Sequence, residues 1–518
     1  MRALLLALLV VAAAGPACVT TQQVDPDRSP DPRDDLPELA APAPSPAELK
    51  RAQLAAEHPL ATVVALSDAE PQAELRVVLS TGSADDPAGK EGIAGLLARL
   101  LGHGTEKLTA AELAETLTRM SATLDVRADK DAIALTGRVP REHAAAYAEL
   151  LLDVLLHPRL TAEELDRCKD EQRAQLREPP RDGPESSMSR ATLEALIYGG
   201  ATFVPGAFKE GARHGYAHAT AGTPAGIDAV TIEDVRGLHE RALVRDRLVL
   251  GVAGSAPTAL VARLTSALEA LPFSDGERAP PAPPAQPDDN VLVVVETPTA
   301  GATIAVGFAL ADLARAHADY PALAVAMAWL SEHRAPVDHV LDAAHTRRGV
   351  GLGECDAQGP PPTGQIACLA PGLPRRSWHF SSWVGPVERK SRLFMLRQTL
   401  DELDRFVRDG IPDDESFARA QAAVQASGQR ALAGATRADV NAAIKRHLRA
   451  DRLSLVVVTD DGSAFAADVA ANKRAPPVYL APKVDKARRG EDARIDAVDL
   501  RIAADHVVVV KPDALVGR

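Results

Sequence analysis

The sequence predicts an α+β protein made of two homologous domains. Each is expected to be a mainly antiparallel sheet with packed helices, and a Pro-rich linker joins them. Three observations lead to this fold class. Segments with strand period alternate with segments with helix period, a stretch near the middle repeats a stretch near the end, and prolines crowd residues 279–285 between the copies. The length of 518 residues, with 46% hydrophobic and 25% charged, suits a globular chain of several domains.

The N-terminus predicts an export signal over residues 1–18. Arg2 precedes an apolar run from Ala3 to Gly15, and a small-residue zone follows up to Cys18. That run is shorter than the roughly 20 residues a permanent bilayer helix needs. Cys18 lies where a bacterial lipoprotein signal places its lipidated cysteine, and plain cleavage nearby is the alternative. We therefore expect an exported protein of a bacterium, periplasmic or anchored to the outer membrane as a lipoprotein, with membrane contact only through the lipid.

Residues 19–54 predict a disordered, Pro-rich tether. Asp25–Pro32 and Ala41–Pro46 are rich in proline and contain few large apolar side chains. Such sequence cannot bury enough apolar surface to offset the entropy lost on ordering.

The expected domains are residues 55–275 and 291–475, with a linker over 276–290 and a tail with a terminal strand over 476–518. In the first domain the patterns predict strands at Leu75–Leu79, Ala122–Val126 and Ala132–Val139. They predict helices at Ile93–Leu101, Ala111–Met120, His143–Leu156 and Thr161–Leu176. In the second domain they predict strands at Val291–Val295 and Thr303–Phe308, and helices at Tyr320–Ser331, Leu393–Val407 and Asp413–Ala426.

An internal repeat links the two domains. Thr231–Val235 corresponds to Thr436–Val440, and Asp246 corresponds to Asp451 at the same offset. Each copy predicts a capped helix, a short Asp-Arg turn and an apolar strand. An ungapped match of this density indicates duplication.

Charge and cysteine content exclude some classes of function. The net charge is −13 and aromatic residues make up 3%, so we expect no nucleic-acid-binding surface. Four cysteines are too few for a disulfide scaffold in a chain of this length.

Several motifs together resemble the insulinase-type (M16) metallopeptidase family. They are Gly92-Ile93-Ala94 with Gly104-Thr105, then His157-Pro158-Arg159 with Thr161–Glu164, then Arg213–Tyr216 with Gly222-Thr223-Pro224 and Thr231–Val235. The resemblance covers roughly residues 55–475 and implies two homologous α+β halves, in agreement with the internal repeat.

The family's zinc signature is degenerate here. In the family, His-x-x-Glu-His on the first helix supplies two zinc ligands and the general base. The corresponding residues are Gly95, Ala98 and Arg99, and the third ligand falls near Ala174 or Gln175. The resemblance therefore implies a pseudopeptidase with no catalytic residues, no metal site and no cofactor. We lean against an enzyme, because the Arg99 cation would oppose a zinc ion.

Other metal sites are weaker possibilities. A displaced site could combine His103 with Glu106 and Glu171. His214 and His218 lie four residues apart in a Gly-rich stretch. A third group lies further along the chain: His333, His339, His345, Asp338 and Asp342.

The second half departs from the family's substrate-gripping pattern. Some members use an Arg and a Tyr there, and the corresponding residues are His339 and Leu352, the latter after an Arg348-Gly349 turn. Arg347 or Arg348 could still hold a peptide carbonyl, with a solvated basic turn as the alternative.

The cysteines allow one disulfide. Cys355 and Cys368 could bridge a Pro-rich loop in an oxidising compartment. Cys168 lies on a charged helix and is expected to be a free thiol.

The leading hypothesis is thus an exported, non-catalytic insulinase-like protein. It would bind a peptide or protein segment, or an active M16 sibling as a subunit of a heteromer. One alternative is an active zinc metalloendopeptidase with a displaced site, and another is a structural component of the cell envelope.

Overall fold

The structure is a computed structural model. It describes residues 60–177, 183–199, 201–204, 207–210, 215–274, 276, 278–281, 284, 286–310, 313, 318–333, 337–342, 345–352, 365–369, 375–426, 434–480 and 483–512. The predicted export signal with Cys18 and the predicted tether lie outside these residues. None of the helices in the described ranges combines the length and apolar content that a bilayer crossing requires.

The first sheet has five strands in the order β1-β7-β2-β4-β3. Their bounds are β1 Ala61–Leu66, β2 Gln72–Leu79, β3 Thr123–Ala128, β4 Ile133–Pro140 and β7 Leu248–Gly254. β1 pairs with β7 in parallel, and the other neighbours pair antiparallel. The segments predicted at Ala122–Val126 and Ala132–Val139 correspond to β3 and β4, which pair antiparallel, and β3 lies at an edge of the sheet.

Helices pack on one face of this sheet. They are α2 Ile93–Gly102, α3 Ala110–Arg119, α4 Ala144–Leu156, α5 Ala162–Arg177, α7 Pro224–Ala229, α8 Ile232–Ala242 and α9 Thr258–Glu269. Side chains such as Leu75, Leu97 and Leu151 share one buried apolar core between the strands and these helices. The alternation of buried and half-exposed residues along β7 shows that the opposite face of the sheet is more open.

The second sheet has seven strands in the order β11-β10-β12-β9-β13-β8-β14. Their bounds are β8 Val291–Glu296, β9 Ala302–Leu310, β10 Arg347–Leu352, β11 Gln365–Leu369, β12 Trp378–Val387, β13 Ser454–Thr459 and β14 Val507–Val510. β14 is the strand expected in the tail, and it pairs with β8. Both sheets are mixed. The first contains the parallel pair of β1 and β7, and the second contains parallel pairs of β10 with β11 and of β8 with β13 and β14.

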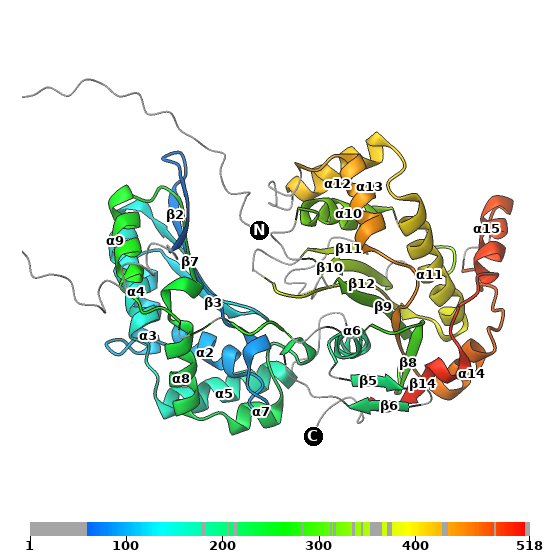
Figure 1. The fold of residues 1–518 in the computed structure, drawn as a ribbon, viewed down its shortest axis with the longest axis horizontal. Helices are drawn as coiled ribbons and strands as arrows, with labels where there is room; N and C mark the ends of the chain where they lie inside the picture. Colours follow the sequence, from blue (N-terminus) through cyan, green and yellow to red (C-terminus); the bar gives the residue numbers. More distant parts are fainter. Residues whose placement is uncertain are drawn as a thin grey trace, which may run out of the picture. The chain divides into compact units, whose positions relative to one another are not determined.

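The second sheet is covered on both faces (Figure 1). The helices of this half are α10 Tyr320–Glu332, α11 Arg392–Asp409, α12 Asp414–Ala426, α13 Arg437–His447, α14 Gly462–Ala470 and α15 Lys486–Asp496. α10 to α13 lie over one face. The other face packs against α6 (Pro184–Ile197), which comes from the first half of the sequence. Close by, β5 (Ala201–Val204) and β6 (Ala207–Glu210) form a two-stranded ladder.

The duplication is visible in the topology. Thr231 and Thr436 are the N-caps of α8 and α13, and each forms a capping box with the Asp three residues later. Each helix leads to a strand, β7 or β13, that lies between a parallel and an antiparallel neighbour. The two α+β halves predicted from the sequence are therefore confirmed.

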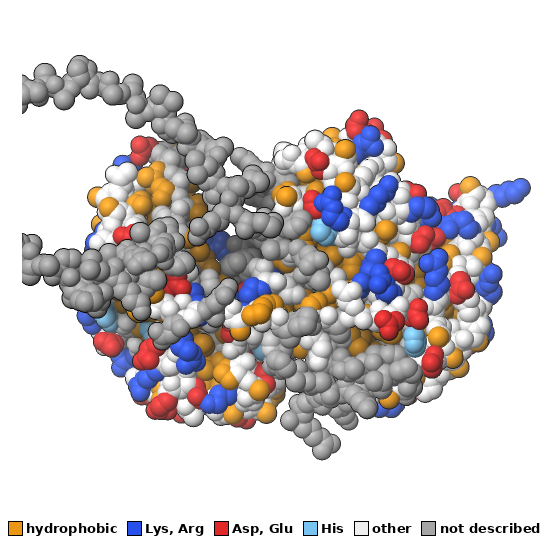
Figure 2. Space-filling model, in the orientation of Figure 1, with side chains coloured by type: hydrophobic (Ala, Val, Ile, Leu, Met, Phe, Trp, Pro, Cys, Tyr) orange, Lys and Arg blue, Asp and Glu red, His pale blue; other side chains and the backbone are white. Residues whose placement is uncertain are grey.

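Acidic and basic side chains are interspersed over the molecular face drawn in Figure 2.

Candidate functional site

α2 carries the residues that the family resemblance aligns with the zinc positions, and hydrogen bonds fix its first turn. The Asp86 carboxylate accepts hydrogen bonds from the backbone N–H of Gly92 (2.6 Å) and of Ala94 (3.2 Å). Burial raises the pKa of Asp86 to about 8, while these two hydrogen bonds act in the opposite direction. The helix ends at Gly102, and Gly104 follows with a φ of 121°. The apolar face of α2 is buried, which directs residues 95 and 99 toward α5.

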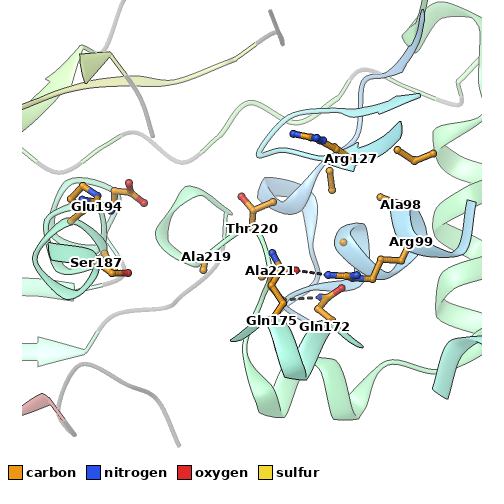
Figure 3. A pocket seen from close by; sticks show the side chains of 15 residues that line it. Ala98, Arg99, Arg127, Gln172, Gln175, Ser187, Glu194, Ala219, Thr220 and Ala221 are labelled. Atoms are coloured by element: carbon orange, nitrogen blue, oxygen red, sulfur yellow. Dashed lines mark hydrogen bonds between the residues drawn. The ribbon is translucent and has the colours of Figure 1, made fainter. Parts of the chain in front are cut away.

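The two helices meet through glutamines rather than metal ligands. A Cβ atom on Gly95 would lie 3.0 Å from Oε1 of Gln172, so the Gln172 amide lies directly against that glycine. Arg99 donates from Nη2 to Oε1 of Gln175, and its Nη1 lies 3.6 Å from Glu171 (Figure 3). Of the two positions predicted for the third ligand, Gln175 faces Arg99, whereas Ala174 is exposed.

These residues line a cavity of about 600 Å³. Four elements and one loop contribute to its wall: Gly95, Ala98 and Arg99 of α2; Val126, Arg127 and Ala128 of β3; Gln172 and Gln175 of α5; Ser187, Arg190, Ala191 and Glu194 of α6; and Ala219, Thr220 and Ala221. Sequence reasoning missed Gln172, α6 and the 219–221 loop. Of these, Gln172 matters most for the chemistry of the wall, because it is 1% exposed.

Two buried acceptors in the cavity wall lack partners among the described residues. They are Oε1 of Gln172 and Oγ1 of Thr220. The Gln172 amide is fixed in orientation, because its Nε2 donates to the carbonyl oxygens of Gly92 (3.0 Å) and Ala221 (2.8 Å). A buried acceptor without a donor costs about 1–3 kcal/mol, so this wall is suited to a ligand that brings hydrogen-bond donors.

β3 lies at an edge of its sheet, beside the cavity. Among the described strands it pairs with β4, and its residues from Val126 to Ala128 line the cavity. An edge strand can bind an added strand through backbone hydrogen bonds.

His103 and Glu171, two members of the displaced metal site considered above, do lie together. Nε2 of His103 is 3.4 Å from Glu171, and its Nδ1 is 3.7 Å from Glu164 and 3.6 Å from Sγ of Cys168. Glu106 is exposed, and its backbone N–H donates to the His157 carbonyl instead. Within the described part of the chain, no three His, Cys, Asp or Glu side chains form a group that could hold a metal.

The other histidine candidates are directed to separate partners. Nδ1 of His218 lies 2.8 Å from the Ala219 carbonyl, and burial lowers the pKa of this imidazole. His214 lies outside the described residues. His339 contacts Asp492 at 3.1 Å, and His345 contacts Asp342 at 2.6 Å.

The same holds for His333, whose Nδ1 lies 3.0 Å from the Trp329 carbonyl. Asp338 was the remaining member of the group considered from the sequence. Among the described residues, it forms no metal-binding group with the three histidines. These side chains therefore do not form the metal site considered from the sequence.

Cys168 is a free, fully buried thiol, as expected. Burial, reinforced by the nearby Glu171 and Glu164 carboxylates, raises its pKa to about 12. We predict that native protein reacts with a thiol reagent such as DTNB at Cys168 at least 100-fold more slowly at pH 8 than urea-unfolded protein does, because the thiolate is the reactive species. The Cys168→Ser variant identifies this thiol. A native rate equal to the unfolded rate would contradict the burial described here.

Residues 347–352 form strand β10, and not the turn expected after Arg348. The Arg348 guanidinium is 4% exposed and donates to Oε1 of Glu402 at 2.6 Å. A Cβ on Gly349 would come within 2.4 Å of the Trp383 ring, so this glycine allows close packing of the sheet. The contact with Glu402 favours a structural role for Arg348, and Leu352 is buried in the apolar core. Cys355 and the side chain of Cys368 lie outside the described residues.

A charge cluster that sequence reasoning missed joins the two halves. It consists of Asp85, Asp129, Asp131, Arg278, Arg375 and Arg376. Asp131 is 1% exposed and accepts from Nε of Arg376 at 2.5 Å and from its backbone N–H at 2.8 Å. Arg375 reaches Asp129 at 2.8 Å. The only sequence signals were the short runs Asp129-Lys130-Asp131 and Arg375-Arg376.

Comparisons with known proteins agree with the resemblance. Residues 62–195 match the family model "Insulinase (Peptidase family M16)". A structure described as the peptidase M16 inactive domain from Pseudomonas fluorescens superposes with a TM-score of 0.60 at 17% identity, covering 77% of this chain and 95% of its own. A protease from Helicobacter pylori gives a TM-score of 0.57 at 15% identity, covering 77% of this chain and 96% of its own.

An M16-like protein from Alicyclobacillus acidocaldarius gives a TM-score of 0.54 at 15% identity, covering 76% of this chain and 95% of its own. At these identities the structural likeness establishes the fold. No curated protein matches the sequence closely enough to count as a relative.

Proposed function

We propose that this chain, a member of the insulinase (Peptidase M16) family, is a non-catalytic one that binds an extended peptide segment. The observation that most directly supports this proposal is the set of side chains at the site. Gly95, Ala98 and Arg99 supply a hydrogen, a methyl group and a guanidinium where the family signature has two imidazoles and a carboxylate.

The residues present do not fit a zinc ion. On α5 the neutral amides of Gln172 and Gln175 line the cavity, the Glu171 carboxylate lies 3.6 Å from Arg99, and Arg99 adds a positive charge. Zinc in proteins prefers thiolate, imidazole and carboxylate ligands, and a general base would need a titratable group where Ala98 lies. No hydrolytic step can be derived from these side chains.

Peptide binding is supported by the surroundings of the cavity. The edge of β3 offers backbone donors and acceptors at the cavity wall, and the orphan acceptors of Gln172 and Thr220 suit the N–H groups of a peptide. The bound segment would come from a free peptide, a partner protein or an active M16 sibling in a heteromer.

We further propose that the chain acts outside the cytoplasm of a bacterium. The charged and apolar start of the sequence up to Cys18 supports export, with lipid attachment at Cys18 as the anchor.

Metal analysis and a cleavage assay test the proposal together. Purified full chain is expected to contain well below one zinc per molecule by mass spectrometry, and to leave unstructured peptides uncut. Cleavage that EDTA abolishes and zinc restores would overturn it in favour of a metalloendopeptidase with a displaced site. His103→Ala and Glu171→Gln variants would then show whether that pair is responsible.

A pull-down from the native envelope addresses the partner. The peptide-binding proposal is supported if the native chain recovers an M16 sibling and the Val126→Pro variant, in which the β3 edge is blocked, does not. Recovery of envelope proteins that does not depend on the β3 edge would favour the structural alternative.

A further inference from the structure

We infer that the cavity beside α2 recognises a peptide carboxylate, and that the Arg99 guanidinium is the group that binds it. This inference rests on the proposed peptide-binding function and names the chemistry recognised at the same site.

Arg99 is positioned by α5 yet keeps donors available. Nη2 donates to Gln175, and Nη1 lies 3.6 Å from Glu171, a separation too long for a hydrogen bond. A guanidinium has five N–H donors, so most of those on Arg99 have no hydrogen-bond partner among the described residues. The side chain is 29% exposed and lines the cavity. A planar, oriented guanidinium of this kind matches the two oxygens of a carboxylate.

The cavity wall contains several cationic donors. Three guanidinium groups line it, those of Arg99, Arg127 and Arg190. Arg127 pairs with Asp125 at 2.6 Å and Arg99 lies 3.6 Å from Glu171, so these charges are partly balanced. A carboxylate in the cavity would still meet guanidinium groups of the kind that bind its two oxygens.

The Gln172 acceptor specifies what lies next to the carboxylate. Its Oε1 is buried without a donor among the described residues, and its Nε2 is occupied by the Gly92 and Ala221 carbonyls, so the amide cannot turn over without losing both bonds. The missing partner is a hydrogen-bond donor, which a backbone N–H group can supply. A peptide C-terminus carries a carboxylate and an adjacent backbone N–H. We therefore expect a C-terminal carboxylate, with an Asp or Glu side chain as the other source of the same chemistry.

The test uses two matched pools of decapeptides, randomised at every position, one ending in a free acid and the other in an amide. Each pool is passed over immobilised full chain, and the retained peptides are quantified by mass spectrometry. The variants are Arg99→Gln, Arg99→Lys and, as a matched control, Arg119→Gln, since Arg119 is an exposed arginine at the end of α3.

We expect the acid pool to be retained at least 10-fold more strongly than the amide pool by native protein and by Arg119→Gln. The ratio should fall to about 1 with Arg99→Gln and recover only in part with Arg99→Lys, which lacks the planar fork. Equal retention of both pools with enrichment of Asp or Glu that Arg99→Gln removes also supports carboxylate recognition, with the side chain as its source.

Retention of both pools with no preference for acid, Asp or Glu would overturn the carboxylate inference and leave the peptide-binding proposal standing. Retention of neither pool above a blank surface would overturn both. Circular dichroism of each variant confirms that a lost preference reflects the site and not unfolding.

Discussion

The variant Gly95→His/Ala98→Glu/Arg99→His/Gln175→Glu is expected to bind one zinc ion per chain with a Kd below about 1 µM, which corresponds to about 8 kcal/mol. The native chain should bind none at this position. Residues 95 and 99 lie one turn apart on α2, and Arg99 already contacts Gln175 across to α5. Two imidazoles and a carboxylate placed there would form a three-ligand set of the kind found in catalytic zinc sites. Isothermal titration with zinc measures the effect.

Two companion variants make this result interpretable. The form that retains Gln175 should bind zinc at least 10-fold more weakly, because it lacks the third ligand, a carboxylate. A Cβ on Gly95 comes within 3.0 Å of the Gln172 amide, so a version that adds Gln172→Ala provides the space for an imidazole. If neither the fourfold variant nor the version that adds Gln172→Ala binds zinc while both remain folded, the assignment of residues 95, 98, 99 and 175 to the zinc site is wrong.

Replacing Asp131 with Ala is expected to lower the free energy of unfolding by about 3–5 kcal/mol, the range typical of breaking a buried ion pair from one side. The loss would remove one of the two carboxylates that the Arg376 guanidinium contacts, Asp85 being the other. It would also leave the Arg376 backbone N–H and the Tyr216 hydroxyl without the carboxylate to which they donate. Because Asp131 belongs to the first half and Arg376 to the second, the change should also loosen the contact between the halves. Urea denaturation followed by fluorescence and by protease sensitivity measures both effects.

Asp125→Ala is the matched control. Asp125 lies on the same hairpin but is 54% exposed and pairs with Arg127 at the surface, so its loss should cost less than about 1 kcal/mol. The two aspartates are thus expected to differ by several-fold in their effect on stability. Equal effects would show that burial of the charge cluster does not contribute as described.

The elements around the site could be predicted because their signals are local. Capping boxes at Thr231 and Thr436 mark helix starts within four residues, and the apolar period of α2 directs residues 95 and 99 to one side of the helix. The spacing along the chain left Ala174 and Gln175 as the residues opposite Arg99, and the structure has Gln175 in contact with it.

Gln172 was missed for a reason of geometry. It lies one turn from Gln175 on the same face of α5, and nothing in the sequence indicates that its amide, rather than a neighbouring side chain, fills the space beside Gly95.

By itself the sequence determined the two-halved α+β architecture and the order of most elements, since these follow from residue type and short-range spacing. The family resemblance aligned Gly95, Ala98 and Arg99 with the metal positions. Only the tertiary structure decided that α6 crosses to the second sheet, that Arg348 lies in a buried strand against Glu402, and that Asp131 meets Arg376. Each of these depends on a contact between residues more than 50 positions apart. The free energy of such contacts comes from burial and charge pairing in three dimensions, and no local period or motif reports it.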